Sequence, residues 1–195
     1  MITDISLLDI NKKYSYANYL TWRFQERVEL IKGRLFKMSP APARKHQAIV
    51  SDLHRQISTF LYKKQCNIYT APFDVRFPKG KGDKQIFTVV QPDICVICDK
   101  SKLDDRGCIG APDLIIEILS PATAKKDVRE KFQLYEESGV KEYWIVSPEN
   151  KLVDVFVLRN DKKYHLINKF TEDDIVKVNS IEGLSINLND VFIEI

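Results

Sequence analysis

The chain has 195 residues, a length typical of one ordinary domain, and 44% of them are hydrophobic, which is enough for a substantial core. Its 30 Lys and Arg residues against 27 Asp and Glu residues give a net charge of +3. Composition therefore neither requires nor excludes a polyanionic partner. We expect a single domain over residues 1–195.

No uninterrupted apolar run approaches the ~20 residues that cross a bilayer, and the first residues lack the basic and apolar regions of a signal peptide. We therefore expect a soluble, cytoplasmic protein with no membrane partner, in which Cys66, Cys95, Cys98 and Cys108 are reduced. Cys95 and Cys98 do not indicate a zinc site. Strand side chains three apart point to opposite faces, and no second Cys pair is present.

The N-terminal half predicts two helices around a hairpin. Residues 15–24 carry aromatic and apolar side chains at helical spacing after Ser15, a favourable cap. Residues 27–38 predict a hairpin that turns at Lys32 and Gly33. Residues 44–64 have apolar side chains at three- and four-residue steps and form the best amphipathic helix of the chain.

The middle of the chain predicts strands. Residues 68–77 and 87–98 are strand-like and are separated by a turn rich in Lys and Gly, whereas residues 99–110 are polar and predict a loop. The most strand-like run lies within residues 110–121, where Glu117 is surrounded by aliphatic side chains. Such a run is typical of a central strand covered on both faces. A buried, ionised Glu117 costs several kcal/mol unless a cation or hydrogen-bond donors compensate it.

The C-terminal half predicts a helix at residues 122–138, ended by Gly139, and then a strand at 142–146. Strand-like segments at 152–158, 164–170 and 175–178 form a β-rich tail. The whole order predicts an α/β fold, in which a central mixed sheet is flanked by helices, with an N-terminal hairpin and a C-terminal β-rich extension.

Three residues form a candidate active site. Asp93 begins one predicted strand and Glu117 lies in the next, so the two carboxylates can converge if these strands are neighbours. Converging carboxylates suit a hard cation such as Mg²⁺ or Mn²⁺. A helical wheel places Lys131 on the sheet-facing side of the following helix, within reach of Glu117. Two acids that hold a metal and one lysine suit phosphodiester hydrolysis.

Several segments together resemble the Uma family of restriction-endonuclease-like proteins, within the PD-(D/E)XK nuclease superfamily. They are QPD at 91–93, GAPDLIIEILSP at 110–121, DVREK at 127–131, GVKEYWIV at 139–146, and more weakly VELIKG at 28–33 and the segment from Ser39 to His46. The resemblance implies the restriction-endonuclease-like fold with an αβββαβ core, and metal-dependent cleavage of DNA. It assigns Asp93 and Glu117 to the two acids of the motif.

The chain departs from the superfamily pattern at Leu119, where a lysine is usual. Either Lys131 supplies that function from the helix, or the site lacks its lysine. Each candidate also has a structural reading: Glu117 as a buried carboxylate satisfied by local donors, Asp93 as a turn residue, and Lys131 as a partner of Asp127 on the same helix.

Five further residues are weaker candidates. Asp113 lies on the same strand face as Glu117 and either joins the outer shell of the metal or caps the strand. Glu29, His46 and Asp74 are acid, base or ligand candidates from the N-terminal half. Asp127 is most simply a residue near a helix N-terminus.

The sequence thus predicts a metal-dependent endodeoxyribonuclease that acts through Asp93, Glu117 and Lys131. The alternatives are a catalytically inactive nuclease fold that binds nucleic acid or a protein partner, and a hydrolase of small phosphoesters. By analogy with dimeric nucleases of this fold, the tail after residue 152 is a candidate homodimer interface.

Overall fold

The computed structural model describes residues 2–38, 42–120 and 126–193. A 3-10 helix η1 (Ile5–Leu7) and a short helix α1 (Tyr16–Tyr19) precede the hairpin of β1 (Val28–Ile31) and β2 (Arg34–Lys37). The hairpin is confirmed: Lys32 and Gly33 have φ of 52° and 83°, as a tight two-residue turn requires. The predicted helix at 15–24 is only four residues long, although Ser15 and Asn18 form the expected cap.

The long amphipathic helix is confirmed as α2 (Arg44–Leu61), which ends three residues before the predicted boundary. Its fully apolar stripe is Ile49, Leu53, Ile57 and Leu61, one residue per turn, and all four are buried.

Two six-stranded mixed sheets are present in the described residues, where we predicted one. The first has the order β2-β1-β5-β4-β8-β7, and the second has the order β12-β11-β10-β9-β6-β3. The strands of the first sheet not yet given are β4 (Val75–Pro78), β5 (Ile86–Val90), β7 (Leu103–Asp104) and β8 (Gly107–Ile109). Those of the second are β3 (Asn67–Thr70), β6 (Ile94–Ile97), β9 (Leu114–Ile118), β10 (Glu142–Ser147), β11 (Leu152–Leu158) and β12 (Tyr164–Thr171).

The prediction of single strands at 68–77 and 87–98 is wrong, because each segment divides between the two sheets. The break in the second segment is the sequence Gln91-Pro92-Asp93, where Pro92 has no N–H for a strand ladder. The predicted loop at 99–110 is also more ordered than expected. It contains a 3-10 helix η3 (Lys100–Lys102) and the short hairpin β7–β8, and another 3-10 helix, η2 (Asp83–Gln85), precedes β5.

The predicted central strand is confirmed as β9, which pairs with β6 on one side and with β10 on the other. Leu114, Ile115 and Ile116 are fully buried. The order implied by the resemblance, αβββαβ, is present as α2, β3, β6, β9, α3 and β10, in which β10 runs parallel to β9. Strands β4, β5, β7 and β8 are insertions into this order, whereas β1 and β2 precede it and the strands from β11 onward follow it.

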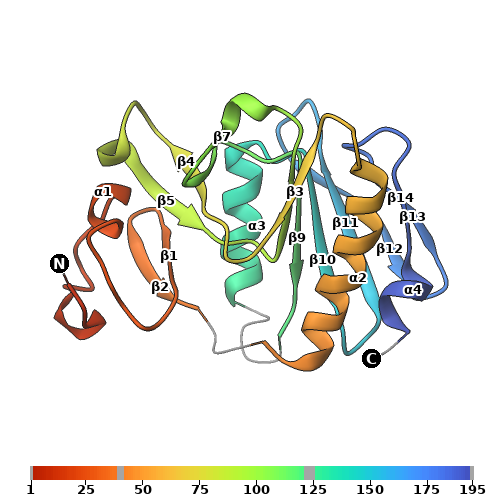
Figure 1. Ribbon diagram of the computed structural model, residues 1–195, viewed down its shortest axis with the longest axis horizontal. Helices are drawn as coiled ribbons and strands as arrows, with labels where there is room; N and C mark the ends of the chain where they lie inside the picture. Colours follow the sequence, from red (N-terminus) through yellow and green to blue (C-terminus); the bar gives the residue numbers. More distant parts are fainter. Residues whose placement is uncertain (1, 39–41, 121–125, 194–195) are drawn as a thin grey trace.

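Helix α3 (Lys126–Ser138) lies between the two sheets, with β1, β2 and β5 on one side and β9–β12 on the other (Figure 1). Its Leu134 and Tyr135 pack in one core cluster with Ile115 and Tyr143 of the second sheet and Phe77 of the first. Gly139 ends the helix with a φ of 84°, as predicted.

The opposite face of the second sheet packs on α2 and on the C-terminal tail. This tail contains β13 (Ile175–Lys177), β14 (Ser185–Asn187) and α4 (Leu188–Phe192), and it lies beyond α2 at the C-terminal end of the molecule (Figure 1). The strand predicted at 175–178 is confirmed, whereas β14 and α4 were not predicted. None of the described helices has the length and apolar character that a membrane span requires.

The prediction that all four cysteines are reduced is wrong. Cys66 and Cys98 form a disulfide, whereas Cys95 and Cys108 are free and buried. The pairing follows from the sheet: Asn67 is opposite Ile97 in the antiparallel pair of β3 and β6, so Cys66 and Cys98 occupy the next facing positions.

Candidate functional site

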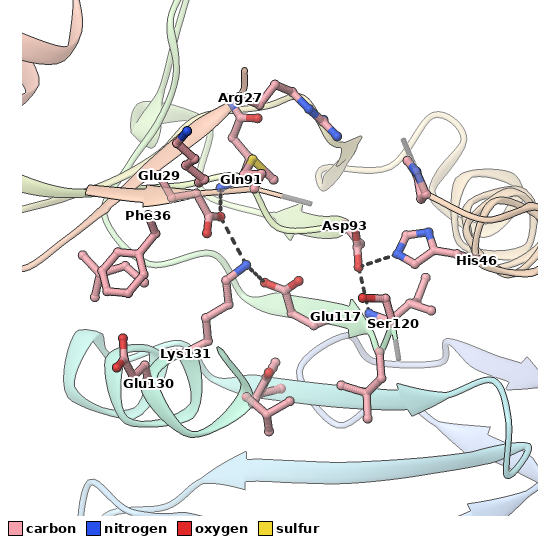
Figure 2. A pocket seen from close by; sticks show the side chains of 18 residues that line it. Arg27, Glu29, Phe36, His46, Gln91, Asp93, Glu117, Ser120, Glu130 and Lys131 are labelled. Atoms are coloured by element: carbon pink, nitrogen blue, oxygen red, sulfur yellow. Dashed lines mark hydrogen bonds and ion pairs between the residues drawn. The ribbon is translucent and has the colours of Figure 1, made fainter. Parts of the chain in front are cut away.

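Asp93 and Glu117 occupy facing positions on adjacent strands. The register of β6 and β9 pairs Ile94 with Ile116 and Cys95 with Ile115, so Asp93, one residue before β6, lies opposite Glu117. Residues that face each other in an antiparallel pair project from the same side of the sheet. Both side chains line one cavity (Figure 2), which has a volume of about 150 Å³. The predicted convergence of the two carboxylates is therefore present.

The carboxylate of Asp93 is held from two sides. Its Oδ2 accepts a hydrogen bond of 2.8 Å from the backbone N–H of Ile118 and lies 3.1 Å from Nε2 of His46, in the first turn of α2. Burial opposes protonation of His46, but the hydrogen bond to Asp93 and the negative charge of that carboxylate raise the pKa of the imidazole. The other ring nitrogen, Nδ1, is buried and has no hydrogen-bond partner among the described residues.

The carboxylate of Glu117 is 12% exposed and has two donors on one oxygen. Its Oε1 accepts hydrogen bonds from Lys131 Nζ at 3.0 Å and from the Tyr135 hydroxyl at 2.7 Å. Burial raises the pKa of Glu117 to about 7; the positive charge of Lys131 opposes this rise, and the nearby carboxylates of Asp93 and Glu29 add to it.

Lys131 projects from α3 between two carboxylates of different sheets. Its Nζ lies 3.0 Å from Oε1 of Glu117 and 3.2 Å from Oε1 of Glu29. Burial disfavours the ammonium, but the two carboxylates outweigh this effect and raise the pKa of Lys131. The predicted contact between Lys131 and Glu117 is thus present. Its alternative partner cannot be compared, because the side chain of Asp127 lies outside the described residues.

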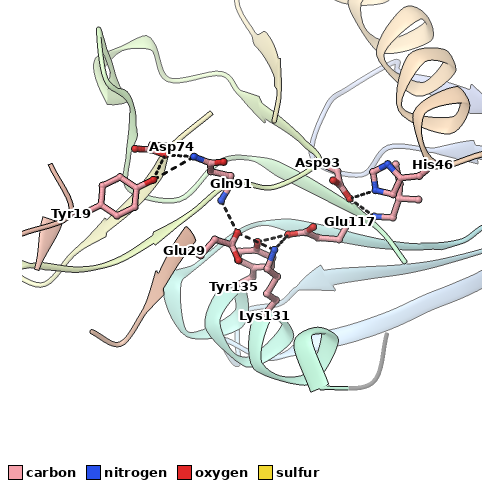
Figure 3. Close-up of polar contacts among 10 residues, drawn as sticks. Tyr19, Glu29, His46, Asp74, Gln91, Asp93, Glu117, Lys131 and Tyr135 are labelled. Carbon is pink, nitrogen blue, oxygen red and sulfur yellow. Dashed lines mark hydrogen bonds and ion pairs between the residues drawn. The ribbon is translucent and has the colours of Figure 1, made fainter. Parts of the chain in front are cut away.

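Glu29 of β1 is buried and belongs to the same cluster. Its Oε1 accepts a hydrogen bond of 2.8 Å from the backbone N–H of Gln91, two residues before Asp93. Figure 3 shows the resulting chain of contacts from Gln91 through Glu29 and Lys131 to Glu117.

Among the described residues, Gln91 joins Asp74 to this cluster. Its carboxylate accepts hydrogen bonds from the Gln91 side-chain amide at 2.9 Å and from the Tyr19 hydroxyl at 3.4 Å (Figure 3). The Tyr16 hydroxyl also donates to it at 3.4 Å. Burial raises the pKa of Asp74, although these hydrogen bonds oppose the rise. Asp74 does not line the cavity that Asp93 and Glu117 share.

Asp113 does not reach the cavity either. One oxygen accepts a hydrogen bond from Lys141 Nζ at 2.6 Å, and the other accepts one from the backbone N–H of Cys98 at 2.7 Å. Of its two predicted roles, the structure agrees with the cap at a strand end, and the outer-shell role at a metal is not supported by this position.

Two residues of the cluster were missed by sequence reasoning. Tyr135 was not among the candidate residues, yet its hydroxyl donates a hydrogen bond to Glu117. A buried tyrosine usually needs a partner for its hydroxyl, so its position four residues after Lys131 was an available signal. Gln91 acts through its backbone N–H, for which the sequence carries no signal.

The cavity combines charged groups with an apolar wall. Arg27 and Lys37 bring further positive charge to it, and Leu119 lies where the superfamily pattern has its lysine. The full lining is Arg27, Glu29, Ile31, Phe36, Lys37, Met38, Pro42, His46, Gln91, Asp93, Glu117, Ile118, Leu119, Ser120, Val128, Glu130, Lys131 and Tyr143. Within the described part of the chain, no three His, Cys, Asp or Glu side chains form a metal-binding group.

The fold of this chain is similar to that of a protein whose crystal structure has been solved. A crystal structure of "a putative nuclease belonging to DUF820" from Anabaena variabilis superposes with a TM-score of 0.71 at 22% identity. The match covers 92% of this chain and 97% of that one. The chain therefore has the restriction-endonuclease-like fold.

The family follows from the sequence match. A family model named Uma2, described as "Putative restriction endonuclease", matches residues 16–189. The chain belongs to the Uma2 family. It is also 26% identical over 183 residues to "Uncharacterized protein slr1290" of Synechocystis sp., a match that covers 92% of each chain.

Proposed function

We propose that this protein is a divalent-metal-dependent endodeoxyribonuclease, in which Asp93 and Glu117 hold Mg²⁺ or Mn²⁺ and Lys131 contacts the scissile phosphate. The observation that carries the proposal is the facing position of Asp93 and Glu117 in one cavity with Lys131. Membership of a family described as restriction endonucleases supports DNA as the substrate.

Each of the two carboxylates has one oxygen that the hydrogen bonds described above do not use, and such an oxygen fits a hard cation. The hydrogen bonds at Glu117 use Oε1, and those at Asp93 use Oδ2, so Glu117 Oε2 and Asp93 Oδ1 carry none of them. Mg²⁺ is commonly bound by one or two carboxylates, with water and substrate phosphates in the remaining positions. Among the described residues the site offers two carboxylate oxygens, and such a pair suits Mg²⁺ or Mn²⁺ better than zinc, which prefers nitrogen and sulfur ligands.

Charge also favours a divalent cation at this place. Glu29, Asp93 and Glu117 bring three carboxylates to a cluster in which Lys131 is the facing ammonium. If the ion pair of Lys131 and Glu29 is counted as neutral and His46 as the neutral imidazole, two negative charges remain. These match the two positive charges of the cation and reduce the electrostatic cost of holding both acids ionised.

The residues of the chain have distinct parts in hydrolysis. A bound cation supplies Lewis acidity toward a phosphodiester. Lys131 supplies positive charge to the phosphoryl oxygens as negative charge develops on them. His46 and the Ile118 N–H orient Asp93, and Tyr135 orients Glu117. Arg27 and Lys37 attract the DNA backbone without regard to sequence.

Two features favour the second candidate, a nuclease fold that binds nucleic acid or a protein partner without cleaving. Leu119 replaces the usual lysine, and Lys131 is engaged by two carboxylates. In the superfamily pattern, by contrast, the strand itself presents the lysine, two residues after the second acid.

Cleavage of supercoiled plasmid DNA with Mg²⁺ or Mn²⁺ separates the two candidates. We expect nicking that requires the cation and falls at least about 100-fold in Glu117→Gln, since this change removes one metal ligand and keeps the shape of the side chain. The matched control is the same substitution at Glu137, Glu137→Gln. Glu137 is an exposed residue of α3 that pairs with Lys32. Retention of DNA without nicking by the unaltered protein would support the binding candidate.

A further inference from the structure

Lys131 has two anchors that differ in kind. Glu117, from β9, is the carboxylate to which we assign the cation, whereas Glu29 comes from β1 of the other sheet. Both Oε1 atoms lie within 3.2 Å of Lys131 Nζ, and the side chain of Lys131 is 13% exposed. Figure 3 shows the ammonium directed at the two carboxylates together.

Glu29 is itself fixed by the surrounding structure. Its side chain is 7% exposed, and the Gln91 N–H donates to the oxygen that contacts Lys131. The side chain of Gln91 is held in turn by Asp74. Because the segment from Gln91 to Asp93 both fixes Glu29 and presents Asp93, the anchor of Lys131 and the first acid share one piece of backbone.

A lysine on a helix needs such an anchor more than one on the strand. Lys131 reaches the site on a flexible four-carbon side chain that loses rotamer freedom when it is held. A cation on Glu117 Oε2 weakens the negative charge of the carboxylate that Lys131 contacts through Oε1, and it repels the ammonium. With Glu117 as its only anchor, Lys131 would be released at the moment when its charge is needed.

We propose that Glu29 is the positioning residue that keeps Lys131 in the site when Glu117 binds the cation. Lys131 of α3 can then replace the strand lysine of the family pattern, whose position Leu119 occupies in this chain. This inference rests on the function proposed above. Glu29 remains paired with the Lys131 ammonium, and Glu117 and Asp93 are thereby left for the cation.

The test uses Glu117→Gln, which mimics a Glu117 that no longer attracts Lys131, and needs neither cation nor cleavage. The protein is labelled with a water-soluble acetylating ester, and the modification of Lys131 is followed by mass spectrometry. We expect Lys131 to be labelled at least about tenfold faster in Glu117→Gln with Glu29→Gln than in Glu117→Gln alone, because a charge-assisted hydrogen bond to the amine is lost. Equal rates in the two variants would overturn the inference.

Two internal controls keep the result interpretable. Lys102, whose Nζ donates to the Ala111 carbonyl at 2.8 Å, reports on folding and should be labelled equally in all variants. Labelling of Lys102 in the double variant would mean that this variant is unfolded. The experiment then uses Glu29→Asp in place of Glu29→Gln, because aspartate keeps the negative charge. Glu29→Asp should then restore slow labelling of Lys131, and fast labelling with this substitution in a folded protein would overturn the inference.

Cleavage assays distinguish failure of the inference from failure of the proposed function. In an active protein, Glu29→Gln should lower kcat about tenfold or more and leave KM for DNA nearly unchanged, since Lys131 is misplaced and the DNA-binding surface is intact. Glu137→Gln again serves as the control. If Lys131 is labelled slowly only when Glu29 is present, but the protein never cleaves DNA, the proposed function is refuted and the role of Glu29 in holding Lys131 stands. If the protein cleaves DNA but the labelling of Lys131 does not depend on Glu29, the inference about Glu29 is refuted and the proposed function stands.

Discussion

At the scale of single residues, the site is a balance between burial and charge at Glu117. Burial and the carboxylates of Asp93 and Glu29 favour the protonated acid, whereas Lys131 favours the ionised one. The sequence could identify Glu117, because an acid within an aliphatic strand needs compensation, and Lys131, because a helical wheel directs it at the sheet. The sequence could not show that Gln91 fixes Glu29, because the contact is made by the Gln91 backbone N–H, which any residue except proline would supply.

The raised pKa of Glu117, about 7, predicts that cation binding depends on pH. A proton and the cation compete for the same carboxylate, so affinity should rise with pH up to about 7 and level off above it. Below that value we expect a loss of about tenfold per pH unit. Titration calorimetry with Mn²⁺ at pH about 6, 7 and 8 measures this.

The control is Glu117→Gln, in which any residual Mn²⁺ binding should lose this dependence. A constant affinity of the unaltered protein between pH about 6 and 8 would mean that Glu117 titrates like an ordinary exposed glutamate, contrary to the burial of its side chain.

At the scale of elements, long periodic segments were predictable and short or interrupted ones were not. The apolar stripe of α2 and the aliphatic run of β9 each favour one structure, because a helix buries the stripe on one face and a central strand buries the run on both. The strands β5 and β6 were predicted as one, since their apolar residues are nearly continuous in sequence. Pro92 marks the break between them, but only the assembled sheets show that the two strands belong to different sheets. The hairpin β7–β8 was predicted as a loop, because two or three residues are too few for a periodic pattern.

The end of α3 provides a test at this scale. Gly139 has a φ of 84°, and a Cβ added there would meet no atom within 4 Å, so Gly139→Ala adds backbone strain without a clash. We expect the free energy of unfolding to fall by about 1–2 kcal/mol, measured by urea denaturation. The control is Gly80→Ala, whose φ lies outside the left-handed region and whose added Cβ would be 3.4 Å from the Gln85 side chain. A similar loss in both variants would show that the φ of Gly139 does not matter.

At the scale of the whole molecule, the site lies where the two sheets meet. Glu29 comes from the first sheet, Glu117 from the second, and Lys131 from the helix between them. A prediction that placed all strands in one sheet could bring Asp93 and Glu117 together but had no reason to bring Glu29 to them. Because both sheets share the core around α3, we propose that the chain forms the single domain that its length suggests.

The central claim is that Asp93 and Glu117 share one divalent cation, and anomalous diffraction from crystals soaked in Mn²⁺ tests it most directly. The account predicts an anomalous peak within about 2.5 Å of a carboxylate oxygen of each residue, with Lys131 still in contact with Glu29. Glu117→Gln crystals treated in the same way should show a much weaker peak. A saturating soak that leaves this position empty, or places Mn²⁺ on only one of the two acids, would contradict the account.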